Sequence, residues 1–130
     1  MTLAALAFVL AGGKPTVLPA AQVPFKPVPA TKLEAADLWG NAKSGPHGTL
    51  ARVPAGSVEP LHRHSADLKV LVVAGSLSYA IEGEPDTPAL TQGSYLLIPA
   101  GTSHASRCAA GADCLFLLVQ DAPMDFLPAK

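Results

Sequence analysis

Three histidines carry the clearest chemistry in this chain of 130 residues. His62 and His64 are separated by one residue, and His104 follows a Pro-Ala-Gly segment at 99–101. Residues two apart on a β-strand point to the same face, so the imidazoles of His62 and His64 can converge on one ion. Imidazole nitrogen suits several divalent transition metals. Alone, such a pair is more often two exposed or hydrogen-bonded histidines, and the surrounding glycines favour a metal site.

Glycines and a proline lie where the chain must turn to deliver these histidines. Gly56 precedes the strand that carries the pair, and Gly75 ends the next one. Pro99 fixes a backbone angle and Gly101 permits the conformation after it, so the following strand, with His104, is aimed inward.

The two segments 56–75 and 93–104, in this order, resemble the two motifs of the cupin superfamily. The resemblance covers about 49–120, and the stretch 38–50 is similar to small single-domain bacterial cupins. It implies an all-β fold, the cupin-type double-stranded β-helix or jelly-roll barrel. It also implies a metal centre with His62, His64 and His104 as ligands, holding Fe, Mn, Ni, Zn or Cu.

The sequence departs from the cupin pattern at the acidic ligand. Cupins usually carry a glutamate four or five residues after the second histidine, where this chain has Leu68 and Lys69. Strand parity with His64 places Leu68 inward and Lys69 outward, and Asp67 would need a bulge to reach inward. Three neutral imidazoles would then hold the ion without a protein anion.

We expect the walls of the pocket to include Leu68, Tyr79 and Cys108. Cys108 stands where the second motif often ends in asparagine, and it shares the strand parity of His104. His47 is interpreted as a turn residue rather than a fourth ligand. No general base is identified, so proton transfer would fall to metal-bound hydroxide or a pocket tyrosine.

The elements expected around these residues are short strands. Alternating or continuous β-prone runs, separated by turn residues, predict strands at 49–53, 58–64, 68–74, 77–81, 95–98, 103–108 and 114–120. The stretch 31–38 fits either a short helical turn or a strand. Such a pattern is typical of a sandwich or barrel.

The composition limits the classes of partner. A net charge of −1 and the lack of a basic stripe argue against nucleic acid, and no apolar run reaches the length of a bilayer-spanning helix. The expected partner is a small-molecule ligand or substrate. Exposed barrel edges favour a homodimer.

Residues 1–30 differ from the rest. An apolar stretch at 3–11 and five prolines within 15–29 predict a signal segment with a Pro-rich linker, ahead of a barrel domain at 31–130. No Lys or Arg precedes Lys14, so an apolar segment packed on the barrel is the alternative. Export would place the protein in the periplasm or outside the cell, where Cys108 and Cys114 would form a disulfide. In the cytoplasm they would be two small apolar residues.

Two functions follow from this site. The first is a metal-dependent dioxygenase that acts on a small chelating organic substrate, because three-histidine iron sites in cupins resemble those of thiol dioxygenases and β-diketone-cleaving enzymes. The second is a non-enzymatic cupin that binds or senses a metal or small ligand. A structural barrel without metal is a third interpretation.

Overall fold

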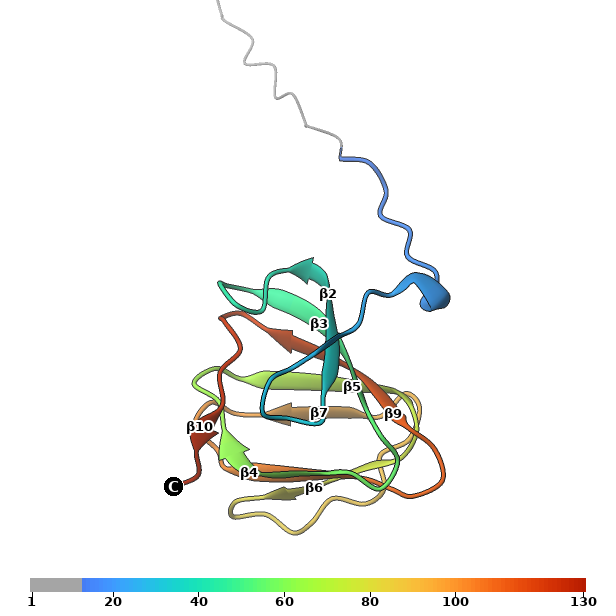
Figure 1. The fold of residues 1–130 in the computed structure, drawn as a ribbon. Helices are drawn as coiled ribbons and strands as arrows, with labels where there is room; N and C mark the ends of the chain where they lie inside the picture. Colours follow the sequence, from blue (N-terminus) through green and yellow to red (C-terminus); the bar gives the residue numbers. More distant parts are fainter. Residues whose placement is uncertain (1–12) are drawn as a thin grey trace, which may run out of the picture.

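Two antiparallel β-sheets face each other in the computed structural model, which describes residues 13–130 (Figure 1). The larger sheet has the strand order β1-β2-β3-β9-β5-β7, and the smaller has the order β10-β4-β8-β6. The strands are β1 Lys26–Pro27, β2 Glu34–Gly40, β3 His47–Val53, β4 Val58–Arg63, β5 Leu68–Ala74, β6 Leu77–Ile81, β7 Tyr95–Ile98, β8 His104–Cys108, β9 Cys114–Gln120 and β10 Leu127–Pro128. This arrangement confirms the predicted all-β jelly roll.

In the central strands, side chains that point into the core alternate with side chains that point outward. In β5, Leu68, Val70 and Val72 are buried while the residues between them are exposed. β9 lies between β3 and β5 and pairs with both. The sequence allowed either a helical turn or a strand at 31–38. In the structure, most of this stretch belongs to the strand β2, which pairs with β3.

The core lies between the sheets and consists mainly of branched aliphatic side chains. Its members come from both sheets and are Ala51, Val53, Leu68, Val70, Val72, Leu77, Tyr79, Ile98, Cys108, Cys114, Phe116 and Leu118. Cys108 and Cys114 form a disulfide that joins β8 to β9 across a short loop. The two sheets are thus linked covalently at the end where Gly75 makes its turn.

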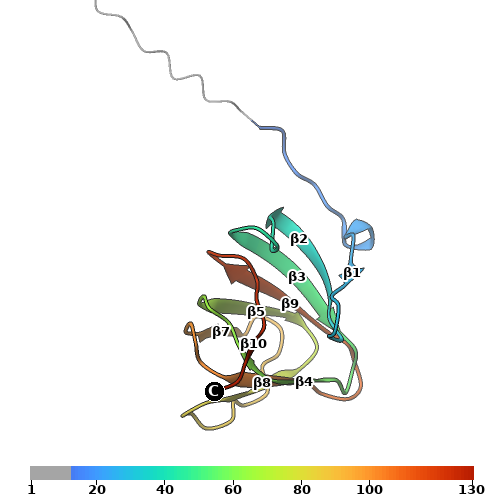
Figure 2. The same ribbon diagram turned by 60° about the vertical axis from the view of Figure 1, so that its left-hand side comes forward.

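The N-terminal part of the described chain first pairs with the larger sheet at β1. After a short 3-10 helix, η1 at Ala20–Gln22, the strand β1 pairs with β2, and the Phe25 ring lies 4.1 Å from the Arg52 guanidinium carbon. Figure 2 shows the preceding residues leaving the barrel. The apolar part of the expected signal segment, 1–12, lies outside the described residues. Within the described part of the chain, no helix has the length and apolar character needed to cross a bilayer.

His47 corrects one expectation from the sequence. It begins β3 rather than occupying a solvated turn, and only 1% of it is exposed. Its Nδ1 lies 2.6 Å from Thr49 Oγ1, and that hydroxyl donates to Asp37 Oδ1 at 2.6 Å. Because the threonine proton goes to the carboxylate, His47 Nδ1 is the donor to Thr49.

The outer face of the larger sheet is apolar and partly open to solvent. Leu71, Val73, Tyr95 and Leu97 are between 39% and 60% exposed. Leu71 is the register partner of Tyr95, so the two side chains share one face. The homodimer expected from the sequence stays a prediction.

Gly75 provides a test of the turn between β5 and β6. Its φ is +83°, and a Cβ there would come within 2.6 Å of the Asp113 carbonyl oxygen. Gly56 has a φ of +77° but open space around it. Gly56→Ala should cost about 1–2 kcal/mol for the left-handed backbone alone. Gly75→Ala should cost clearly more, because its methyl group also meets main chain. Denaturant unfolding of both variants measures the difference, and equal losses would contradict the clash.

Candidate metal centre

The smaller sheet brings the three predicted histidines together. His62 lies on β4 and is the register partner of His104, the first residue of β8. His64 follows β4 directly. The ring centroids are 4.5 to 5.1 Å apart, and one ring nitrogen from each residue lies within 4.8 Å of the others. His64 and His104 are buried, and His62 is half-buried. Among the described residues this is the cluster whose donor atoms suit a metal ion.

Hydrogen bonds to main-chain carbonyls fix the orientation of all three rings. His62 Nδ1 lies 2.7 Å from the Pro60 oxygen, and His104 Nδ1 lies 3.0 Å from the Thr102 oxygen. His64 Nδ1 bonds the carbonyl oxygen of Asp125. A carbonyl oxygen only accepts, so each Nδ1 carries the proton, and each Nε2 keeps its lone pair for a ligand. A hydrogen bond on the second ring nitrogen is what metal-binding histidines generally have.

Burial keeps two of these imidazoles neutral. It lowers the pKa of His104 to about 4, a shift that the Thr102 carbonyl opposes and the neighbouring His62 and His64 increase. Burial likewise lowers the pKa of His64, against the hydrogen bond to Asp125. Neutral rings are the form that binds metal, so the site is ready for an ion near neutral pH.

A small cavity of about 40 Å³ adjoins the three rings. Leu68 and Tyr79 line it, as the sequence analysis expected, and Lys69 is exposed. Cys108 does not line it; the residue is buried, but its sulfur is bonded to Cys114 at the far end of β8. The other walls are mostly apolar and include Leu33, Val53, Phe116, Leu118, Met124 and Phe126. A larger hollow of about 210 Å³, around Asp67 and Gln120, contains no histidine.

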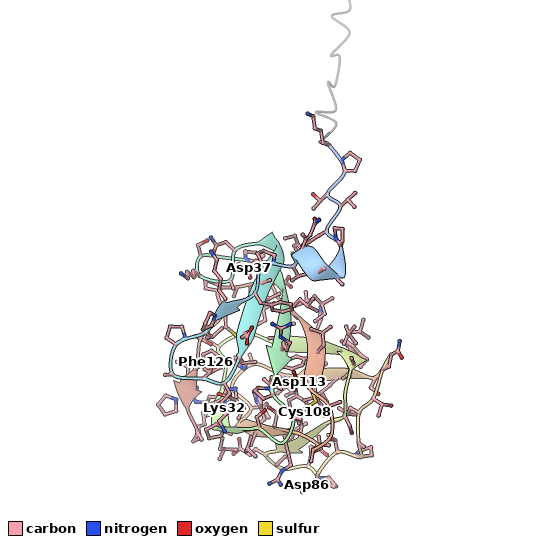
Figure 3. The ribbon with its side chains drawn as sticks, turned by 45° about the vertical axis from the view of Figure 1, so that its right-hand side comes forward. Lys32, Asp37, Asp86, Cys108, Asp113 and Phe126 are labelled. Atoms are coloured by element: carbon pink, nitrogen blue, oxygen red, sulfur yellow. A yellow bond between two sulfur atoms is a disulfide. The ribbon has the colours of Figure 1, made fainter. Side chains whose placement is uncertain are left out.

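The C-terminal segment 121–130 forms one wall of the cavity, and we call it the strap. Phe126 packs its ring 5.3 Å from that of His62 and 5.5 Å from that of His64. Asp125 is held by Ser65, whose main-chain NH and hydroxyl both donate to its carboxylate. Phe126, labelled in Figure 3, is 40% exposed. The strap therefore both covers the cavity and supplies the hydrogen-bond acceptor of His64.

Sequence reasoning missed one carboxylate in the site. Glu59 lines the cavity, although strand parity with His62 would turn it outward. A register shift between Glu59 and His62 places two exposed residues, Pro60 and Leu61, between them. Burial raises the pKa of Glu59, an effect that the nearby His62 and Lys32 oppose. A proline before a His-x-His pair is the only local hint of that bulge.

The depressed pKa of His104 predicts how the metal-free protein responds to acid. The unfolded chain binds a proton near the ordinary value of 6.5, but the folded chain does so only near 4. Stability is therefore complete above pH 6.5 and falls as the pH drops toward 4, by on the order of 2–3 kcal/mol from this residue. Unfolding of metal-free protein measured across this range should show the loss. His104→Gln should flatten it, and an unchanged slope in that variant would contradict the assignment.

Comparisons with known proteins agree with this fold. A family model described as the ChrR cupin-like domain matches residues 14–124. The polyketide cyclase RemF from Streptomyces resistomycificus is similar in structure, with a TM-score of 0.69 and 22% identity over 88% of this chain and 83% of that one. KdgF from Halomonas sp. has a TM-score of 0.65 and 17% identity over 82% of this chain and 94% of that one.

An RmlC-like cupin from Ralstonia eutropha JMP134 has a TM-score of 0.67 and 21% identity, over 88% of this chain and 73% of that one. At such identities these structures show the fold alone. No curated protein sequence matches the chain significantly. The family model spans most of the chain, and this protein is therefore a member of the ChrR cupin-like domain family of cupins.

Proposed function

We propose that the protein binds one divalent transition metal through His62, His64 and His104. The observation that carries this proposal is the set of three Nδ1-to-carbonyl hydrogen bonds, which leaves three Nε2 lone pairs at one end of a cavity. Fe, Mn, Ni, Zn and Cu all fit an imidazole set.

The charge of the site favours an anionic ligand. Three neutral imidazoles supply no negative charge to a divalent ion, and Leu68 stands where many cupins have a glutamate. Glu59, the carboxylate that lines the cavity, would offset only part of the charge. The bound ion would supply Lewis acidity and, if it is redox-active, one-electron chemistry. Its open positions and the apolar walls suit a small organic chelator whose charge completes the balance.

Within this frame, the enzymatic function that we propose is a dioxygenase acting on such a chelating substrate. The support is the chemistry of the three-histidine set and the mainly apolar lining from Val53, Phe116 and Phe126. These walls would exclude bulk water from the reacting groups, and the three carbonyl bonds would keep the rings in place during a change of ligand.

The size of the cavity favours a second candidate, a binding or sensing role without catalysis. About 40 Å³ holds one or two waters beside an ion, whereas pockets for drug-sized ligands have several hundred Å³. A cavity this small fits capture of the metal itself. An organic substrate would require the strap to move.

We also propose that the protein is exported. The Cys108–Cys114 disulfide persists in oxidising compartments, and the segment 1–12 has the apolar character of a signal. Thiol titration of protein from the periplasm should find no free thiol before reduction and two after it. Two free thiols before reduction would contradict export.

Metal content is the direct test of the site. Untagged wild-type protein should carry about one equivalent of a transition metal by mass spectrometry, since its three donors match a facial three-histidine site. His104→Ala should lose the metal. His47→Asn is the matched control, because His47 is a buried histidine outside the cluster and asparagine keeps a donor near Nδ1. Wild-type protein that stays metal-free after anaerobic reconstitution with each ion would overturn the proposal.

Oxygen uptake separates the two candidate functions. Metal-loaded protein should consume dioxygen with a member of a panel of β-dicarbonyls and thiols if it is a dioxygenase, and His104→Ala should abolish the uptake. Tight metal binding without uptake on any compound of the panel would favour the binding or sensing role.

A further inference from the structure

The outer face of the larger sheet carries apolar side chains where a solvated sheet carries polar ones. On the adjacent strands β5 and β9, outward side chains alternate with buried ones. The outward residues are Lys69, Leu71, Val73, Leu115, Leu117 and Val119. An antiparallel sheet with one face in water alternates apolar with polar residues. These two strands instead have the composition of strands that are covered on both faces.

The apolar positions continue from strand to strand. Leu71 is the register partner of Leu117 on β9 and of Tyr95 on β7. Leu117 also pairs with Leu50 on β3. Register partners lie on one face with their Cβ atoms about 5 Å apart, so these four side chains form one apolar row. Leu71 and Tyr95 are 43% and 60% exposed, so the row is open to a partner at its β5–β7 end.

Trp39 extends this face to β2. Its register partner on β3 is Gly48, and a Cβ on that glycine would come within 2.1 Å of the indole ring. The ring therefore lies directly over the glycine main chain, and Gly48 is buried beneath it while 52% of Trp39 is exposed. A rigid aromatic ring that is held against a sheet and still presents half of its surface is a frequent anchor of protein interfaces.

Few charged side chains share this face. Glu34 and Arg52, at its β2–β3 edge, form an ion pair with each other at 2.7 Å. Lys69 lies at the start of β5, beside the hollow that Asp67 and Asp121 also line. Its ammonium can therefore stay in water while its stem covers apolar surface. Depletion of charge is typical of interface cores, and homodimer interfaces are more apolar than those of transient complexes.

The size of the face suits a dimer. It crosses the five strands β2, β3, β9, β5 and β7, four of which are seven residues long (Figure 2). At about 4.8 Å between strands and about 3.3 Å per residue, it measures roughly 24 by 23 Å before the relief of the side chains is added. Its accessible area is then close to the roughly 800 Å² that each partner buries in a standard interface.

We propose that this face binds the same face of a second copy of the chain about a two-fold axis. The two larger sheets then stack about 10 Å apart, with the row of Leu71 and Tyr95 near the centre. An apolar face is complementary to itself and needs no opposite charge. The inference places association at the face of the sheet, whereas the homodimer was expected from exposed strand edges. It is independent of the metal function, because these side chains point away from the histidine cavity.

Sedimentation of a charged variant tests the interface. Wild-type protein at about 100 µM should sediment with twice the chain mass of 13.3 kDa, since interfaces of this size have micromolar or lower dissociation constants. Leu71→Lys puts a second ammonium beside Lys69 in the centre of the face. The change occurs twice in a two-fold interface, so the dissociation constant should rise at least about a hundredfold.

Leu61→Lys is the matched control. Leu61 is a 53% exposed leucine on β4 of the smaller sheet, and Arg63 stands two residues from it as Lys69 does from Leu71. This variant should dimerise as the wild type does. Cooperative melting is checked for each variant, and Leu97→Lys on β7, at a residue 42% exposed, serves if Leu71→Lys does not fold. Wild-type protein that is monomeric at this concentration would overturn the proposal and leave the face to the segment 1–12 or to another protein.

Oxidative footprinting locates the contact independently. Hydroxyl-radical labelling of Tyr95 should fall severalfold from dilute to concentrated wild-type protein, while that of Phe126, on the strap, should stay constant. In Leu71→Lys the labelling of Tyr95 should not change with concentration. A wild-type dimer that labels Tyr95 as strongly as the monomer, or a Leu71→Lys variant that still dimerises fully, would overturn the face as the interface and assign association to a strand edge.

Discussion

The antiparallel pairing of β4 with β8 is the constraint on which the site depends. It sets His62 opposite His104, and the bulge in β4 lets Glu59 and Ser106 face the same cavity a few residues away. Two strands with a strict two-residue period would have placed either the histidines or the glutamate inside, but not both. One extra residue in the ladder thus places three imidazoles and a carboxylate around a single cavity.

The strap connects metal binding to access. His64 is oriented by the carbonyl of Asp125, while Phe126 and Met124 on the same segment close the cavity. Moving the strap to admit a ligand would also remove the acceptor that orients His64. An ion held by His64 should in turn favour the closed strap, because linked equilibria act in both directions. If a metal binds, ligand size and metal affinity would therefore be coupled through residues 121–130.

The sequence was sufficient to predict those features of the site that depend on residues close together in the chain. The histidine pair, the turn before His104 and the inward side of Leu68 follow from strand parity and from glycine and proline positions. The place of Glu59 in the cavity could not be predicted from strand parity, because a bulge changes that parity. The place of the strap could not be predicted either, because its contact with His64 joins residues that are 61 positions apart. Cys108 was assigned the correct buried side, but four residues along a strand are about 13 Å, so it lies beyond the cavity. His47 was assigned to a turn, but it begins β3, where its partner Thr49 lies two residues away and donates in turn to Asp37 on the paired strand β2.

The residues at positions 59 and 68 together determine the charge of the cavity. A buried glutamate as fourth ligand would neutralise part of the ion and reduce its pull on an incoming anion. With Leu68 in that place, a bound ion would have no carboxylate from this position, and the negative charge of the cavity would come from Glu59. The absence of an acid at position 68 and the presence of one at position 59 thus move the negative charge of this cavity from the usual ligand position to a wall beside the three imidazoles.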